Sequence, residues 1–171
     1  MTAIRTYTGR DFDFESATVS DIDIEDIAHA LSMLNRFTGH TPLGPISVAQ
    51  HSVLCAQFAP AGFKLEALLH DAHEAYCNDL PTPLKKLLPD YCAIERRIEG
   101  LVREAFNLPP TMSREVHEVD RRMLVTEAKV CCFGWWKELG VQPFPVHTMG
   151  SWPWHMAKQA FLATFEEHRG A

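Results

Sequence analysis

Residues 63–77 of the chain read FKLEALLHDAHEAYC. Apolar residues recur here at helical intervals and a stretch with two prolines follows, so the spacing predicts a helix over 64–76. One side of this helix is apolar, whereas His70, Asp71 and Glu74 share another stripe. A helix with these two faces is expected to be buried on both, and buried charges need partners or a metal.

Two further helices are expected to point ionisable groups at the same interior. His51 follows a helix start capped by Ser47 and Gln50, in a helix predicted to run to about residue 59. Asp120 adjoins an apolar stripe of a later helix, although it could instead pair with a neighbouring arginine. A single histidine on an apolar face is more often a core residue whose hydrogen bonds are satisfied. The prediction of a metal site therefore depends on several ionisable groups facing the same interior. Two imidazoles and two carboxylates suit Mn, Fe, Co or Zn better than an all-oxygen Mg site: His51, His70, Asp71 and Asp120.

The rest of the chain predicts more helices and no convincing series of strands. An aromatic and polar alternation around Thr8-Gly9-Arg10 indicates a small hairpin or extended arm, and the glycines and prolines of 35–45 indicate an ordered loop. The expected fold class is therefore all-α, a helical bundle in a single domain over 1–171, with residues 1–20 as an N-terminal hairpin or arm. The remaining helices are predicted at 24–34, 84–88, 91–106, 113–138 and 154–168.

Composition limits the classes of function. The 171 residues include 16 Lys and Arg against 22 Asp and Glu, a net charge of −6, which argues against a general nucleic-acid binder. Five cysteines with no CxxC spacing indicate reduced, mostly buried thiols (Cys55, Cys77, Cys92, Cys131 and Cys132). No stretch approaches the ~20 apolar residues of a membrane span, so a cytoplasmic protein without a membrane partner is expected.

Several stretches together resemble a known family. They are Asn35-Arg36-Phe37, Ser47-Val48-Ala49-Gln50-His51-Ser52, Leu69-His70-Asp71-Ala72-His73-Glu74-Ala75, Asn78-Asp79-Leu80-Pro81-Thr82-Pro83-Leu84-Lys85, and Asp120. The sequence resembles the HD-domain metal-dependent phosphohydrolases, and most of all the small branch that includes bacterial 5′-deoxynucleotidases and phage deoxynucleoside triphosphohydrolases. The resemblance runs from Arg36 to about Lys129, over half the chain, and implies an HD-domain helical bundle.

The resemblance also implies roles for individual residues. By this likeness the metal ligands are His51, His70, Asp71 and Asp120. Glu74 resembles the residue that orients or deprotonates the attacking water, and its place one helical turn after His70 agrees with that role. Asp79 matches a position that assists near the substrate. Arg36 and Lys85 match phosphate-binding positions, although Arg36 could merely complement the dipole of a preceding helix.

Some positions depart from the family pattern or add to it. Phe37 stands where the deoxynucleotidase branch typically has a tryptophan that packs on the sugar, which leaves sugar discrimination open. His73 points about 100° away from Glu74 by helical geometry, which favours a surface or supporting position over ligation. His40 is expected in solvent. The four tryptophans lie outside the matched stretches and favour core packing or a subunit interface.

The implied function is metal-dependent hydrolysis of deoxynucleotides, with release of phosphate from 5′-monophosphates. The alternatives are a deoxynucleoside triphosphate triphosphohydrolase, for example on dATP, that releases tripolyphosphate, and a non-catalytic nucleotide-sensing module. The implied cofactor is a divalent transition metal (Mn, Co, Zn or Fe, with Mg as an alternative). A homo-oligomer is expected, and no nucleic-acid polymer as partner.

Overall fold

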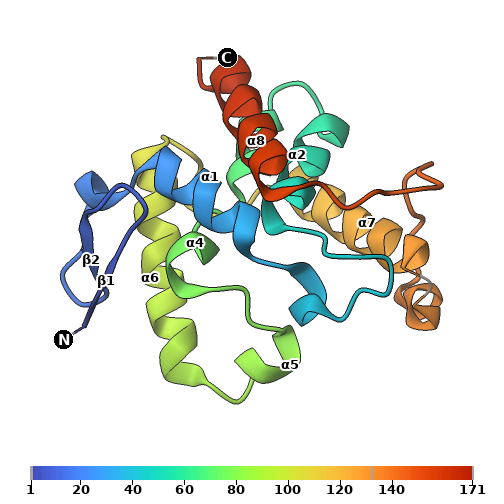
Figure 1. Cartoon of the computed structure of the whole chain (residues 1–171), viewed down its shortest axis with the longest axis horizontal. Coiled ribbons are helices and arrows are strands. Elements are labelled where there is room, and N and C mark those ends of the chain that lie inside the picture. The colour runs from blue at the N-terminus through green and yellow to red at the C-terminus, as the bar shows by residue number, and fades with distance from the viewer. Residues whose placement is uncertain (1, 132, 171) are drawn as a thin grey trace.

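The computed structural model describes residues 2–131 and 133–170, and Met1, Cys132 and Ala171 lie outside this part of the chain. The described residues are mostly helical with one two-stranded hairpin, as the sequence predicts (Figure 1). In chain order the elements are β1 (Ala3–Arg5), β2 (Asp11–Asp13), η1 (Val19–Asp21), α1 (Ile24–Met33), η2 (Arg36–Gly39), α2 (Val48–Phe58), α3 (Lys64–Leu69), α4 (Glu74–Cys77), α5 (Thr82–Lys85), α6 (Pro89–Ala105), α7 (Arg114–Val130), η3 (Gly134–Leu139) and α8 (Trp154–His168).

The N-terminal segment forms the predicted hairpin and is anchored in the core. β1 and β2 pair antiparallel, and Gly9 turns the chain between them with a φ of 84° that favours glycine. Phe12 of β2 is fully buried and stacks on Tyr76 of α4, with ring centroids 4.2 Å apart. The backbone N–H of Thr8 donates to Asp26 of α1 at 2.6 Å. The segment is therefore a part of the fold rather than a loose arm.

Helices α1 and α2 each begin at a side-chain cap, and the one at Ser47 was predicted. Asp23 accepts from the backbone N–H of Glu25 at the start of α1, and Ser47 accepts from the N–H of Gln50 at the start of α2. The Gln50 side chain does not complete the expected capping box. It instead donates to the carbonyl of Gly150 at 2.8 Å and so ties α2 to the segment before α8.

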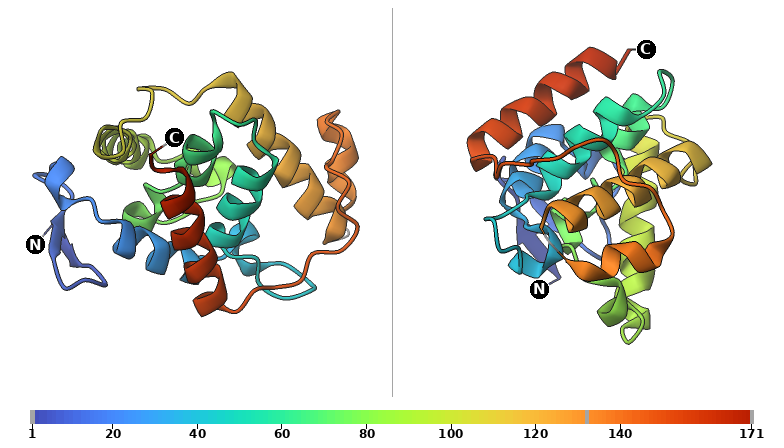
Figure 2. Two further views of the ribbon diagram at one scale, coloured as in Figure 1. Left: turned by 90° about the horizontal axis from the view of Figure 1, so that it is seen from above. Right: turned by 90° about the vertical axis from the view of Figure 1, so that its right-hand side faces the viewer.

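Helix α2 lies between two apolar clusters. One cluster joins it to the hairpin, α1, α4, α6 and α8, and the other joins it to α3, α7 and Phe144. α8 packs across both α1 and α2, while the hairpin and the 134–139 segment lie at opposite ends of the molecule (Figure 2). A polar side chain on α2 is therefore enclosed from both sides, and His51 is fully buried.

The helix predicted over 64–76 is wrong in one respect, because it divides into α3 and α4. Between them the backbone tightens into i→i+3 hydrogen bonds: the N–H of Ala72 donates to the carbonyl of Leu69, and the N–H of Glu74 donates to that of Asp71, both at 3.0 Å. Residues three apart eclipse one another in such a turn, so Asp71 and Glu74 are brought to one side.

The helix predicted over 113–138 is too long. α7 ends at Val130, where the N–H of Phe133 reaches back to the carbonyl of Ala128 at 2.8 Å and closes the helix, and the 3₁₀ turn η3 follows. The helices predicted at 84–88 and 91–106 begin two residues earlier than expected, since proline is tolerated in a first helical turn.

Two other expectations bear on the described part of the chain. Cys55, Cys77 and Cys92 carry free thiols there. Within residues 2–131 and 133–170, no helix combines the length and the apolar character that crossing a lipid bilayer requires.

Candidate metal centre

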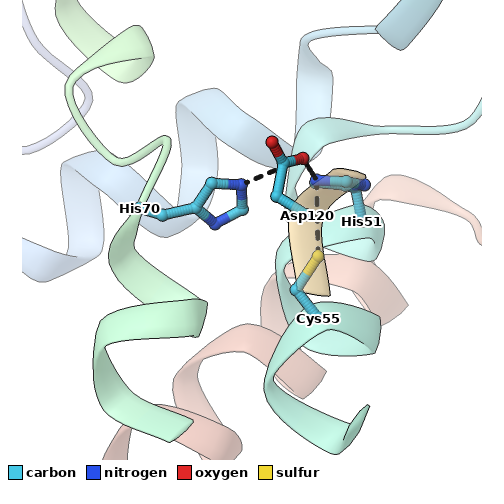
Figure 3. Close-up of side chains that lie close together, drawn as sticks. All are labelled: His51, Cys55, His70 and Asp120. Atoms are coloured by element: carbon cyan, nitrogen blue, oxygen red, sulfur yellow. Dashed lines mark hydrogen bonds and ion pairs between the residues drawn. The ribbon is translucent and has the colours of Figure 1, made fainter. Parts of the chain in front are cut away.

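Side chains from three parts of the chain converge beside α2. His51 comes from α2, His70 from the tight turn after α3, and Asp120 from α7 (Figure 3). Asp71 follows His70 in the same turn. The Nε2 atom of His51 lies 3.2 Å from Asp120 Oδ1, and that of His70 lies 3.7 Å from the same oxygen. Asp71 Oδ2 lies 3.1 Å from the Nε2 atom of His70 and 3.9 Å from that of His51. The structure thus brings the four predicted ligands together, while neighbouring Arg121 donates to the carbonyl of Leu139 rather than to Asp120.

Hydrogen bonds at the far side of each ring fix which nitrogen faces the cluster. The Nδ1–H of His70 donates to the carbonyl of Ala67 at 2.8 Å, and the Nδ1–H of His51 donates to Glu127 Oε1 at 2.8 Å. In the neutral rings, Nε2 then carries the lone pair that points at the carboxylates. His70 Nε2 is buried and has no hydrogen bond of acceptable geometry within the described residues, despite the nearby Asp71 oxygen. Two lone pairs and two carboxylates facing one point require protons or a cation between them.

The charges of the cluster favour a divalent cation. Burial works to raise the pKa of Asp71, Asp120 and Glu127, but the neighbouring basic groups outweigh it and hold all three below their ordinary values. Burial lowers the pKa of His51 and His70, yet the neighbouring acidic groups prevail and raise both well above 6.5. Without a metal the two rings are therefore protonated; when they give up these protons to bind a metal, three carboxylates face one guanidinium, and a divalent cation would balance the excess.

The distances also fit donors of one ion. Two ligands held by a metal at about 2.0–2.3 Å lie roughly 3–4 Å apart. The four contacts between the Nε2 atoms and the carboxylate oxygens span 3.1 to 3.9 Å. A group of His51, Cys55, His70 and Asp120 offers one donor atom each within 4.8 Å of one another, so it could hold a metal ion. Cys55 was not predicted as part of this group, although its place four residues after His51 puts it on the same helix face.

Glu127 is a second residue of the candidate site that the sequence analysis did not predict. It is fully buried on α7, where its Oε2 accepts from Arg36 Nε at 2.8 Å while its Oε1 accepts from His51. A carboxylate behind a metal-binding histidine orients the ring and raises its basicity. Glu127 lies two helical turns after Asp120, on the same face, and that spacing was the available signal.

Arg36 is placed by these carboxylates rather than by a helix end. Its Nη1 lies 3.6 Å from Asp71 Oδ2, and its side chain is 12% exposed. α1 ends at Met33 with Leu34 as its cap, and Arg36 lies beyond that cap. The polar contacts of Arg36 therefore do not support the alternative that it complements the dipole of α1. Burial alone would lower the pKa of Arg36, but the carboxylates, led by Glu127, raise it, and the guanidinium stays charged.

Glu74 stands at the edge of the cluster with one free oxygen. It is 5% exposed, its Oε1 lies 4.0 Å from Lys85 Nζ, and its Oε2 has no hydrogen-bond partner within the described residues. Burial, reinforced by Asp71 and Asp79, raises its pKa well above the ordinary value of 4.5. Asp79 is half-buried, and burial raises its pKa as well.

Lys85 is held near Glu74 by a second carboxylate. Lys85 Nζ lies 2.6 Å from Glu95 Oε1, and the same oxygen lies 3.7 Å from His73 Nε2. His73 is buried and forms none of the contacts to Asp71 or Asp120 that His51 and His70 form. His73 therefore supports the site through Glu95. A supporting position is one of the two that helical geometry predicts for His73.

The residue after Arg36 enters an aromatic group. Phe37 has a φ of 55°, in the left-handed region that non-glycine residues rarely adopt, and its ring lies 5.4 Å from that of Phe133 and 6.4 Å from that of Trp135. Such backbone strain often accompanies functional sites. Trp135 is 39% exposed, so it does not pack in the core, and the alternative of a subunit interface stays a prediction; His40 is exposed as expected.

The chain is similar to two uncharacterized bacterial proteins. No protein-family model matches it. It is 49% identical over 129 residues to the uncharacterized protein YfdR of Escherichia coli (strain K12), a match that covers 75% of this chain and 72% of YfdR. It is also 38% identical over 117 residues to an uncharacterized protein of Rhodobacter capsulatus, covering 63% of this chain and 60% of that protein. The extent of the first match shows that the chain belongs to the same family as YfdR.

Proposed function

We propose that the chain is a metal-dependent phosphohydrolase of the HD type that releases phosphate from deoxynucleoside 5′-monophosphates. The observation that carries this proposal is the convergence of two imidazole nitrogens and two carboxylates beside Glu74, whose Oε2 has no hydrogen-bond partner among the residues that the structure describes. The likeness of the sequence motifs to HD phosphohydrolases supplies the substrate class. His51, His70, Asp71 and Asp120 would hold the cation.

The first chemical task is to activate water. A divalent cation bound here would polarise a phosphoryl oxygen and lower the pKa of water. Glu74 would accept the proton at Oε2, and its raised pKa makes the carboxylate a stronger base near neutral pH. Asp79, whose pKa burial also raises, would carry a proton to the leaving oxygen.

The second task is to bind the phosphate. Arg36 and Lys85 are the two cations beside the cluster, and each is fixed by a carboxylate, Glu127 for the first and Glu95 for the second. Fixed cations lose little conformational entropy when they meet phosphate oxygens, and guanidinium can bind two of them at once. Phe37, next to Arg36, would contact the sugar.

A surface pocket adjoins the proposed base. Glu74 lines it together with residues of α1 and Asn78, and its volume is about 310 Å³. That volume lies at the lower end of the range for small-molecule pockets. Its lining includes neither the four proposed metal ligands nor Arg36 or Lys85, so the pocket reaches the proposed base from the side of α1.

The proposal can be tested by incubating the purified protein with the common deoxynucleoside 5′-monophosphates and triphosphates, with Mn²⁺ or Co²⁺, and identifying the products by chromatography. Inorganic phosphate from a monophosphate is the expected product. Tripolyphosphate from a triphosphate would show the alternative reaction, and no turnover of any substrate would refute the proposal.

A matched pair of variants separates catalysis from binding. Glu74→Gln should lower kcat by about 10²–10⁴ while metal content stays unchanged, because it removes the proton acceptor and no ligand. Glu104→Gln, at an exposed position of α6, is the control and should retain full activity. If Glu74→Gln were as active as the control, Glu74 would not be the base, and a nucleotide-sensing role would gain support.

A further inference from the structure

Cys55 adds a sulfur atom to the candidate metal centre. It lies one helical turn after His51 on α2, and its Sγ is 3.4 Å from His51 Nε2 (Figure 3). We propose that Cys55 is a metal ligand and that this sulfur makes the centre select a thiophilic cation, such as zinc, cobalt(II) or iron(II), over Mg²⁺ and Mn²⁺. The inference rests on the metal site of the proposed function and assigns its metal class.

The position of the sulfur agrees with shared coordination. For a zinc–nitrogen bond of about 2.05 Å and a zinc–sulfur bond of about 2.3 Å, a tetrahedral angle separates the two donors by roughly 3.5 Å. The observed Sγ to Nε2 distance is 3.4 Å. Sγ also lies within 4.8 Å of the donor atoms of both His70 and Asp120, so small movements bring all of them to one ion.

The interior of the site points to a ligand independently of the cysteine. His70 Nε2 is buried, is 3.7 Å from Asp120 Oδ1, and has no hydrogen-bond partner within the described residues. Its other nitrogen is already bound to the carbonyl of Ala67, which leaves the Nε2 lone pair for a cation. Cys55 and this nitrogen therefore face one volume.

The alternative role for Cys55 is to pack in the core as a small apolar side chain. Its side chain is fully buried and belongs to the apolar cluster that includes Val116 and Met123. A cysteine used only as a small apolar residue would tolerate alanine without any effect on the metal. A ligating cysteine binds as the thiolate, and soft thiolate donors favour zinc, cobalt and iron, whereas Mg²⁺ prefers oxygen.

The test is to replace the metal of the purified full chain with cobalt(II) and record its absorption spectrum. A sulfur-to-cobalt charge-transfer band in the near ultraviolet is expected for the wild type. It should be absent from Cys55→Ala and Cys55→Ser, which should also bind zinc about 10–100-fold more weakly in competition with a chelator. Cys92→Ala is the matched control, because Cys92 Sγ donates to the carbonyl of Lys85 outside the cluster. This variant should keep both the band and the affinity.

X-ray absorption of the zinc-loaded wild type gives a second measurement that needs no variant, so it stands even where Cys55→Ala fails to fold. A sulfur scatterer at about 2.3 Å is expected. Metal bound without the band and without this scatterer would overturn the ligation by Cys55 and leave the proposed phosphohydrolase intact. The band together with no turnover of any nucleotide would support Cys55 as a ligand and overturn the proposed function. A folded wild type that binds neither cobalt nor zinc would overturn both.

Discussion

Replacing Glu127 with glutamine removes one charge from the centre of the site and keeps the shape of the side chain. In the wild type the two carboxylate oxygens accept separate hydrogen bonds, one from Arg36 and one from His51, each at 2.8 Å. Glutamine has a single carbonyl oxygen, so it can accept from one of these donors only. Its amide NH₂ group would then face the other donor, and a buried N–H would lose its acceptor.

The expected loss of stability follows from these contacts. A buried donor without a partner costs about 1–3 kcal/mol, and breaking a buried ion pair costs about 3–5 kcal/mol. Asp71 Oδ2 stays 3.6 Å from Arg36 Nη1 and still balances part of the charge of Arg36. We therefore expect Glu127→Gln to lower the free energy of unfolding by about 2–4 kcal/mol, which corresponds to roughly 5–15 °C in Tm for a chain of this size. Zinc affinity should fall about 10–100-fold, because the orientation of His51 is no longer fixed.

Urea unfolding of the metal-free protein, followed by circular dichroism, measures the first effect, and competition with a chromophoric chelator measures the second. Glu118→Gln, at an exposed position of the same helix, is the control and should change the free energy of unfolding by less than about 0.5 kcal/mol. The reasoning is refuted if Glu127→Gln matches this control in both stability and zinc affinity.

Three further outcomes can be checked with the same assays. Glu66→Ala should destabilise by about 3–5 kcal/mol and leave zinc affinity unchanged, since it exposes no ligand but breaks the buried 2.8 Å pair with Arg103; an unaltered melting curve would contradict this. Burial opposes ionisation of Glu95, but hydrogen bonds from His73 and Lys85 prevail and lower the pKa of Glu95 to about 2. The ionised Glu95 therefore stabilises the fold fully above pH 4.5, and this stabilisation is lost as the pH falls toward 2. Unfolding of Glu95→Gln should lack that part of the acid dependence. Zinc at about 100 times its Kd should raise the free energy of unfolding by about 2.7 kcal/mol, and no shift in Tm would argue against a site present only in the folded state.

The helices with clear periodicity and caps could be predicted from sequence. Asp23 and Ser47 begin α1 and α2 as local hydrogen-bonding chemistry predicts, and the bounds agree within a residue or two. The break after Leu69 could not be predicted, because a 3₁₀ turn and an α-helix share nearly the same apolar spacing over a few residues. Tertiary packing decides between them, and the same holds for the end of α7 at Val130.

The site was predicted to the extent that its residues belong to one recognisable pattern. The convergence of His51, His70 and Asp120 depends on helix faces, which periodicity does indicate. Cys55 lies four residues after His51 on the same helix, so its contact with His51 was open to prediction, whereas the contacts of Glu127 with His51 and Arg36 depend on which side chains meet between segments far apart in the sequence. A rule of asking for the partner of every carboxylate on an apolar face would have singled out Glu127.

The stacking of Phe12 on Tyr76 has a consequence for the order in which the chain folds. During synthesis the hairpin leaves the ribosome before α4 has been made, so its one fully buried ring, Phe12, lacks Tyr76 as a partner for part of that time. We expect closing this long-range contact to be slower than forming the helices between, and it fixes the segment that carries Glu74. We therefore expect the segment that carries Glu74 to reach its final place late, once the hairpin has packed against it.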